Sequence, residues 1–133
     1  MYSFEYQRPK SAADAAKAAA ADSEASFMAG GQTLIPTLKQ RLRQPSTVID
    51  LDGIGDLKGI TVTADTVTIG AMTCHADVAN SADIKRVAPV IAKLAGGIGD
   101  PQVRNRGTIG GSIANNDPAA DYPAAVVALD AKV

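Results

Sequence analysis

Three Gly-Gly pairs are the sequence feature that most constrains the fold of this chain: Gly30-Gly31, Gly96-Gly97 and Gly110-Gly111. The first and third pairs follow short apolar segments, and a hydroxyl residue (Thr33 or Ser112) comes within two positions after each. Glycine permits positive φ angles and lets another molecule approach the backbone closely. Consecutive N–H groups in such a loop can form an anion-binding surface. These two pairs are therefore either tight turns or the two sides of a phosphate clamp, and spacing alone leaves both interpretations open.

Strands and helices are predicted to alternate in the first part of the chain. Tyr2, Phe4 and Tyr6 alternate with polar residues, which indicates a short strand that ends at Pro9. An alanine-rich run and a set of leucine and isoleucine residues at helical spacing predict two helices. The expected order is a helix over 11–21, a buried strand over 26–29, a helix over 34–42 and a strand over 48–51.

The second part of the chain begins with a predicted hairpin. Residues 60–63 and 67–69 alternate in hydropathy on either side of Asp65-Thr66. A short helix is expected from Thr73, and apolar spacing predicts further helices. These helices cover residues 84–95 and 122–129, and residues 131–133 resemble the start of another strand.

Composition and charge exclude several classes of protein. The chain has 133 residues, which suits one domain, and its formal net charge of −1 lacks the basic excess of a nucleic-acid binder. No apolar run is long enough for a membrane span, and no secretory signal is visible, so a cytoplasmic location is expected. Because there is one cysteine, the chain can form neither an internal disulfide nor a multi-thiolate metal site.

The common nucleotide-binding motifs are absent. Gly97-Ile98-Gly99 is not completed to G-x-G-x-x-G, and no G-x-x-x-x-G-K-[ST] segment occurs. Both absences disfavour a Rossmann or P-loop module.

Few residues suggest catalysis by this chain itself. The neighbouring side chains of Cys74-His75 point in different directions in a strand or a helix, which disfavours a nucleophile–base pair. Asp117 and Asp121 are four residues apart and could share a helix face, for acid–base work or for binding ribose-like hydroxyls. They could equally lie at a helix N-terminus. Arg104 and Arg106 could contact a phosphate or a partner protein, or be solvated.

Three segments resemble those of a known family: residues 29–36, 99–112 and 117–124. They are similar to the two FAD loops and a following motif in the flavoprotein (medium) subunits of molybdenum hydroxylases, such as carbon-monoxide dehydrogenase and xanthine dehydrogenase. The resemblance implies an α+β FAD-binding domain of the vanillyl-alcohol-oxidase type (PCMH-type). Its two subdomains would be residues 1–55 and 56–133, with the second incomplete and the chain apparently truncated at its C-terminus.

The resemblance also implies which residues bind the cofactor. One segment would wrap the FAD diphosphate: Phe27, Met28, Ala29, Gly30, Gly31, Gln32, Thr33 and Leu34. A second would close its other side: Thr108, Ile109, Gly110, Gly111 and Ser112. Asn115 and Asp121 would bond the flavin's polar parts or ribityl chain, and Ile98 would lie near the isoalloxazine ring. No catalytic or metal-binding residue is expected on this chain.

The function implied is electron transfer within a heteromeric complex. Electrons would pass from a molybdenum cofactor on a large subunit through two 2Fe–2S clusters on a small subunit to FAD, and then to an external acceptor. The alternative is a non-enzymatic assembly or interaction fragment of the same fold without FAD. A self-contained oxidase with covalently attached FAD is disfavoured, because His75 and Cys74 lie outside both glycine loops. A fragment ending at Val133 is expected to bind FAD weakly or not at all.

Overall fold

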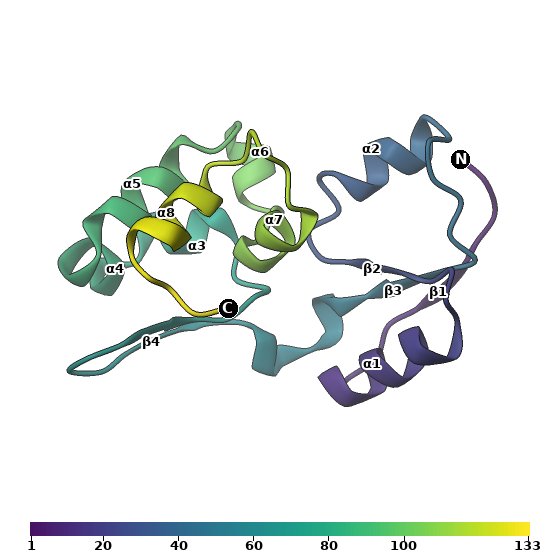
Figure 1. The fold of residues 1–133 in the computed structure, drawn as a ribbon, viewed down its shortest axis with the longest axis horizontal. Coiled ribbons are helices and arrows are strands. Elements are labelled where there is room, and N and C mark those ends of the chain that lie inside the picture. The colour runs from purple at the N-terminus through teal and green to yellow at the C-terminus, as the bar shows by residue number, and fades with distance from the viewer.

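The computed structural model describes residues 1–133 and arranges them in two groups of elements (Figure 1). One group holds a small sheet with helices α1 and α2, and the other holds helices α3 to α8. Two 3₁₀ turns connect the groups, at Leu51–Gly53 and Gly55–Leu57. The subdomain boundary predicted between residues 55 and 56 lies in this connection and stays a prediction.

The sheet of the first group is parallel, with its strands in the order β1-β3-β2. The strands are β1 (Glu5–Gln7), β2 (Ser26–Met28) and β3 (Thr47–Asp50). Helices α1 (Ala12–Ala21) and α2 (Leu34–Lys39) follow β1 and β2, and they lie on opposite sides of the sheet (Figure 1). Every residue of the central strand β3 is buried, as expected for a parallel strand covered on both faces.

Helix α1 is fixed by its cap and by one small buried residue. The Ser11 hydroxyl accepts a hydrogen bond from the Asp14 N–H at 3.1 Å, which satisfies a donor that the first turn leaves open. Ala15 packs against Ile49 of β3 and Ile54 of the connection, and all three are buried. The predicted helix over 11–21 is therefore confirmed, and its small residues allow close contact with the sheet.

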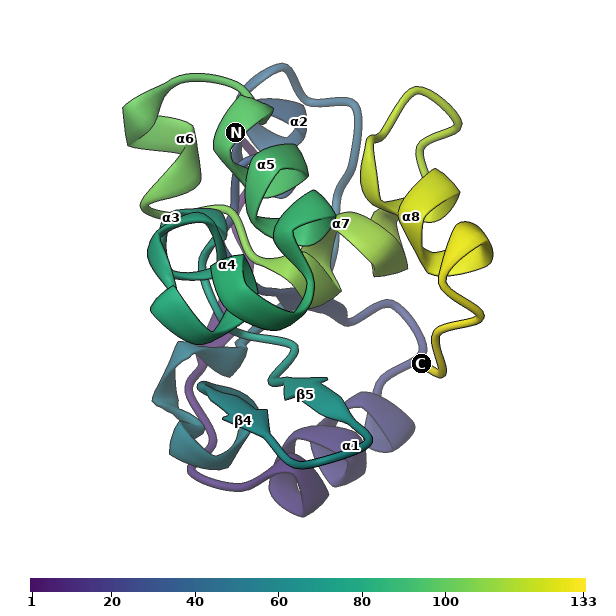
Figure 2. The same ribbon diagram turned by 90° about the vertical axis from the view of Figure 1, so that its left-hand side faces the viewer.

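The predicted hairpin is also confirmed. Strands β4 (Ile60–Val62) and β5 (Val67–Ile69) pair antiparallel, with Ile60 opposite Ile69. Figure 2 shows the hairpin below the helices of the second group. The side chains of Ile60 and Ile69 pack against the buried cluster of those helices.

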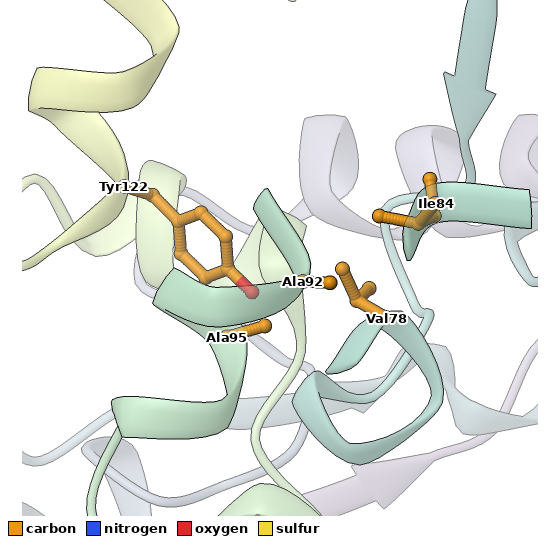
Figure 3. Close-up of a cluster of buried hydrophobic side chains, with 5 residues drawn as sticks. All are labelled: Val78, Ile84, Ala92, Ala95 and Tyr122. Carbon is orange, nitrogen blue, oxygen red and sulfur yellow. The ribbon is translucent and has the colours of Figure 1, made fainter. Parts of the chain in front are cut away.

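Six helices form the second group: α3 (His75–Asn80), α4 (Ala82–Val87), α5 (Pro89–Gly97), α6 (Pro101–Arg104), α7 (Ile109–Asn115) and α8 (Tyr122–Ala128). Their buried cluster consists of Val78, Ile84, Ala92, Ala95 and Tyr122 (Figure 3). Two members are alanines of α5, and the ring of Tyr122 projects from α8 towards them. None of the helices is long and apolar enough to cross a membrane.

Three sequence-based expectations about these elements are wrong. The helix predicted over 84–95 is two helices, because Ala88 leaves the helical conformation (φ −142°, ψ 61°) before Pro89, whose ring disfavours a helical conformation in the preceding residue. Residues 131–133 form no strand. The strand at 26–28 is not fully buried, because Phe27 is 50% exposed at the sheet edge.

Candidate functional site

The two glycine segments predicted to bind a ligand are residues 27–34 and residues 108–112. They meet between the two groups of elements. A Cβ atom added to Gly30 would collide with the carbonyl oxygen of Arg106 and lie 2.8 Å from the Cα atom of Gly107. A Cβ atom on Gly111 would lie 3.0 Å from the Cβ atom of Ala29. Gly30 is therefore required for close packing of backbone on backbone, and Gly111 leaves room for the side chains of Ala29 and Thr108.

The first glycine segment follows β2 directly and carries unpaired backbone donors. Gly31 has a φ of +76°, which turns the chain from β2 towards α2. The N–H groups of residues 30–33 donate no hydrogen bond within the chain, and Gln32 and Thr33 are exposed. A run of neighbouring free N–H groups in a turn can bind the oxygens of an anion such as a phosphate.

The second glycine segment is not the loop that the sequence predicted. Gly110 and Gly111 lie in the first turn of α7, and the Thr108 side chain caps this helix. The Gly110 N–H donates to the carbonyl of Ala71 (2.8 Å). The Gly111 N–H donates to Thr108 Oγ1 (3.1 Å). Both N–H groups already donate hydrogen bonds within the chain and are not free for a ligand. The two glycines therefore serve mainly to let neighbouring residues pack closely.

The Ser112 hydroxyl makes no hydrogen bond within the chain and is half-buried, which leaves it available to a ligand. The antiparallel bridge between Cys74 and Thr108 holds the segment beside the start of α3. The Ile109 N–H adds a hydrogen bond to the Thr73 carbonyl (3.1 Å). The position of the second segment is therefore set by residues 71–75.

The other predicted binding residues lie at the ends of helices in the second group, and none of them lines the cleft at the junction. Asn115 is exposed at the end of α7, and Asp121 is exposed immediately before α8. Ile98 is half-buried against the helical cluster, and its carbonyl accepts a hydrogen bond from Arg104 (3.1 Å). Asp117 lies outside any helix, so a helix face shared with Asp121 is wrong.

A buried polar pair that the sequence did not reveal lies behind the second glycine segment. His75 and Tyr122 are 4% and 1% exposed, and His75 Nδ1 is 3.2 Å from the Tyr122 hydroxyl. Burial lowers the pKa of His75, and the Asp121 carboxylate raises it by a smaller amount. Burial also raises the pKa of the Tyr122 hydroxyl, and the Asp121 charge adds to that rise. Both groups are therefore neutral near pH 7.

The lowered pKa of His75 predicts a loss of stability in mild acid. The unfolded chain takes up a proton below a pH of about 6.5, whereas the folded chain resists it, so the free energy of unfolding should fall as pH drops below that value. Urea unfolding at pH 7.5 and pH 5.5 measures the difference. His75→Gln removes the only histidine and should abolish this dependence. An equal unfolding free energy for the unsubstituted protein at both pH values would contradict the prediction.

A cleft of about 380 Å³ opens at the same junction. Its lining includes Ala29, Gly30 and Thr108 from the predicted segments, and Arg106, which the sequence offered as a possible phosphate contact. It also includes residues that the sequence did not single out for binding: Asp52, Lys58, Gly59, Ile60, Met72, Thr73 and Asp77. The Lys58 ammonium lies 2.7 Å from the Asp52 carboxylate and holds its pKa below the usual range. No local motif marks these residues, since the cleft forms only when the two groups pack together.

The Cys74 thiol also lines this cleft, and burial raises its pKa. A thiol with a raised pKa is a weak nucleophile. Its neighbour His75 is committed to Tyr122, so the arrangement does not assemble a Cys–His catalytic pair. No group of three or more His, Cys, Asp or Glu side chains that could hold a metal ion is present.

The family model described as "FAD binding domain in molybdopterin dehydrogenase" matches residues 2–133. The chain belongs to this family of FAD-binding domains. The FAD-binding domain is 45% identical over 129 residues to the carbon monoxide dehydrogenase medium chain of Hydrogenophaga pseudoflava, covering 96% of the chain and 45% of that relative. It is 39% identical over 128 residues to the nicotine 6-hydroxylase medium subunit of Paenarthrobacter nicotinovorans, covering 96% of the chain and 45% of that relative.

A solved structure supports the same assignment. The FAD-binding domain superposes on carbon monoxide dehydrogenase from Hydrogenophaga pseudoflava, in a form that lacks the Mo-pyranopterin moiety, with a TM-score of 0.93 and 44% identity. The match covers 96% of the domain and 45% of that chain. The expected fold, an α+β FAD-binding domain of the PCMH type, is confirmed. The chain spans less than half the length of these relatives.

Proposed function

We propose that this chain binds FAD between its two glycine segments, as part of the flavoprotein subunit of a molybdenum-containing hydroxylase or dehydrogenase. The observation that carries the proposal is the run of free N–H groups at residues 30–33, beside the point where the segments meet. These donors fit the oxygens of a diphosphate. Because the chain has a net charge of −1, it does not attract an anionic diphosphate by its overall charge. Hydrogen-bond donors directed at the diphosphate are therefore more important for binding.

Three sets of polar groups have distinct roles in this proposal. The N–H groups of residues 30–33 donate to the diphosphate oxygens, and the Ser112 hydroxyl provides a donor on the second side. Asp121 has no partner within the chain for its exposed carboxylate, which is available to flavin or ribityl groups. Bound FAD supplies the redox chemistry, and the protein supplies its position and surroundings.

We propose further that the whole protein works in a complex with a molybdenum-binding large subunit and an iron–sulfur small subunit. In this complex, electrons from the iron–sulfur clusters reach FAD and then an external acceptor. The relatives named above are a medium chain and a medium subunit, which supports a multi-subunit assembly. Their names refer to unrelated substrates, carbon monoxide and nicotine, so we propose that another subunit selects the substrate.

Purification from the native source through a tag on the whole protein tests this assembly. We expect two further subunits to co-purify, with molybdenum, iron and flavin present together. The single cysteine of the FAD-binding domain cannot ligate an iron–sulfur cluster, so we propose that the partner subunits hold both metals. Full substrate oxidation by the flavoprotein alone would contradict the proposal.

A further inference from the structure

We infer that His75 and Tyr122 form a positioning pair, which fixes Asp121 relative to the second glycine segment and thereby tightens FAD binding. This inference rests on the proposed function, in which Asp121 and that segment both contact FAD. Neither His75 nor Tyr122 lines the cleft. The pair would act only through the residues that it holds in place.

His75 contacts the second glycine segment with both its backbone and its ring. Its N–H donates to the Gly107 carbonyl at 3.0 Å. A Cβ atom added to Gly107 would lie 2.8 Å from His75 Nε2, so the imidazole packs directly against that backbone. The next residue, Thr108, caps α7. A shift of the imidazole would therefore be transmitted to the residues that close the second side of the site.

Tyr122 connects the same imidazole to α8. Its ring centroid lies 5.4 Å from that of His75, and its ring projects from α8 towards Ala92 and Ala95 of α5 (Figure 3). Figure 2 shows α8 at the edge of the helical group beside α7. Tyr122 and Ala125 are the only buried residues of α8. The Tyr122 side chain is therefore the main anchor of this helix.

Asp121 depends on that anchor because nothing else holds it. It precedes Tyr122 directly, and its side chain makes no capping hydrogen bond to α8. Its carboxylate has no hydrogen-bonding or ionic partner in the chain. The His75–Tyr122 hydrogen bond is directional, unlike an apolar contact. It can therefore fix the rotation of the first turn of α8, and with it the direction of the carboxylate.

The test is a double-mutant cycle in the whole protein, with FAD affinity measured by flavin fluorescence. Tyr122→Phe removes only the hydroxyl and leaves the ring, so we expect the Kd for FAD to rise about threefold to tenfold, as for loss of one hydrogen bond. In an Asp121→Asn background the same change should alter the Kd less than about twofold, because coupled residues are non-additive. His75→Asn, which keeps a hydrogen-bonding group near Nδ1, should retain more affinity than His75→Leu.

A matched control separates positioning from general stability. Ile84→Val removes a methylene from the same buried cluster, on α4, and should lower the Tm without changing the Kd for FAD. An unchanged Kd in Tyr122→Phe, or an equal change with and without Asp121→Asn, would overturn the inference while the proposed function stands. Failure of the unsubstituted protein to bind FAD would instead overturn the proposed function.

Discussion

Gly30→Ala should abolish FAD binding at concentrations that saturate the unsubstituted protein. The added methyl group would collide with the Arg106 carbonyl oxygen and lie 2.8 Å from Gly107 Cα. Both are backbone atoms and cannot rotate away as a side chain would. Overpacking costs about 1–3 kcal/mol of folding stability. If the two segments separate to relieve the collision, FAD binding must restore their close approach, and a cost at the upper end would weaken it about 100-fold. Equilibrium titration of the deflavinated whole protein with FAD measures this.

The matched control is Gly97→Ala, the same substitution in another Gly-Gly pair. Gly97 ends α5, and a Cβ atom there would meet no atom within 4 Å. Neither Gly30 nor Gly97 has a positive φ, so the two variants differ in steric contact and not in backbone strain. Gly97→Ala should leave the Kd unchanged. Equal Kd values for Gly30→Ala and Gly97→Ala would show that the close approach of the two segments is unimportant for the cofactor.

Gly111→Val should have the second-largest effect, a loss of FAD accompanied by a lower Tm. Its Cβ atom would lie 2.8 Å from Thr108 Oγ1, the atom that accepts the Gly111 N–H, and 3.0 Å from Ala29 Cβ. The valine would therefore displace Thr108, which caps α7, and Ala29, which precedes the free N–H groups of residues 30–33. Loss of a cap alone costs about 1 kcal/mol. Flavin content of the purified variant, together with its thermal unfolding, measures both effects.

Ala114→Val is the control within the same helix. Ala114 is exposed on α7, so a valine there carries the modest helix-propensity cost of a β-branched residue and no collision. We expect flavin content equal to that of the unsubstituted protein. Flavin retained at full stoichiometry in Gly111→Val would mean that the second segment does not lie against the cofactor site in the way proposed.

Local patterns predicted most of the elements of this fold. Alternation of side chains identified the hairpin at residues 60–62 and 67–69, and the alanine-rich run identified α1. These features depend on neighbours in sequence, so one sequence is enough to see them. Pro89 separates α4 from α5. The proline was visible in the sequence, but the helical spacing of the apolar residues predicted one continuous helix.

Long-range contacts explain what the sequence could not predict. One of the two interpretations of the glycine pairs gave Gly110 and Gly111 free N–H groups, but Ala71 and Thr108 accept hydrogen bonds from them. Nothing in the local sequence indicates that residue 71 would lie there. The contact between Gly30 and Arg106 and the pairing of His75 with Tyr122 likewise join distant segments. The resemblance predicts which residues surround the cofactor, and the structure shows which of their backbone donors are still free.

The most direct test of the account is the stoichiometry and mode of FAD binding by the whole protein. Deflavinated protein should bind one FAD per chain reversibly, because the proposed contacts are hydrogen bonds from residues 30–33 and neighbouring side chains. Denaturation should then release all of the flavin into solution. Flavin that stays attached to the denatured chain, or an unsubstituted whole protein that binds no FAD, would contradict the proposal that these two glycine segments form a non-covalent FAD site.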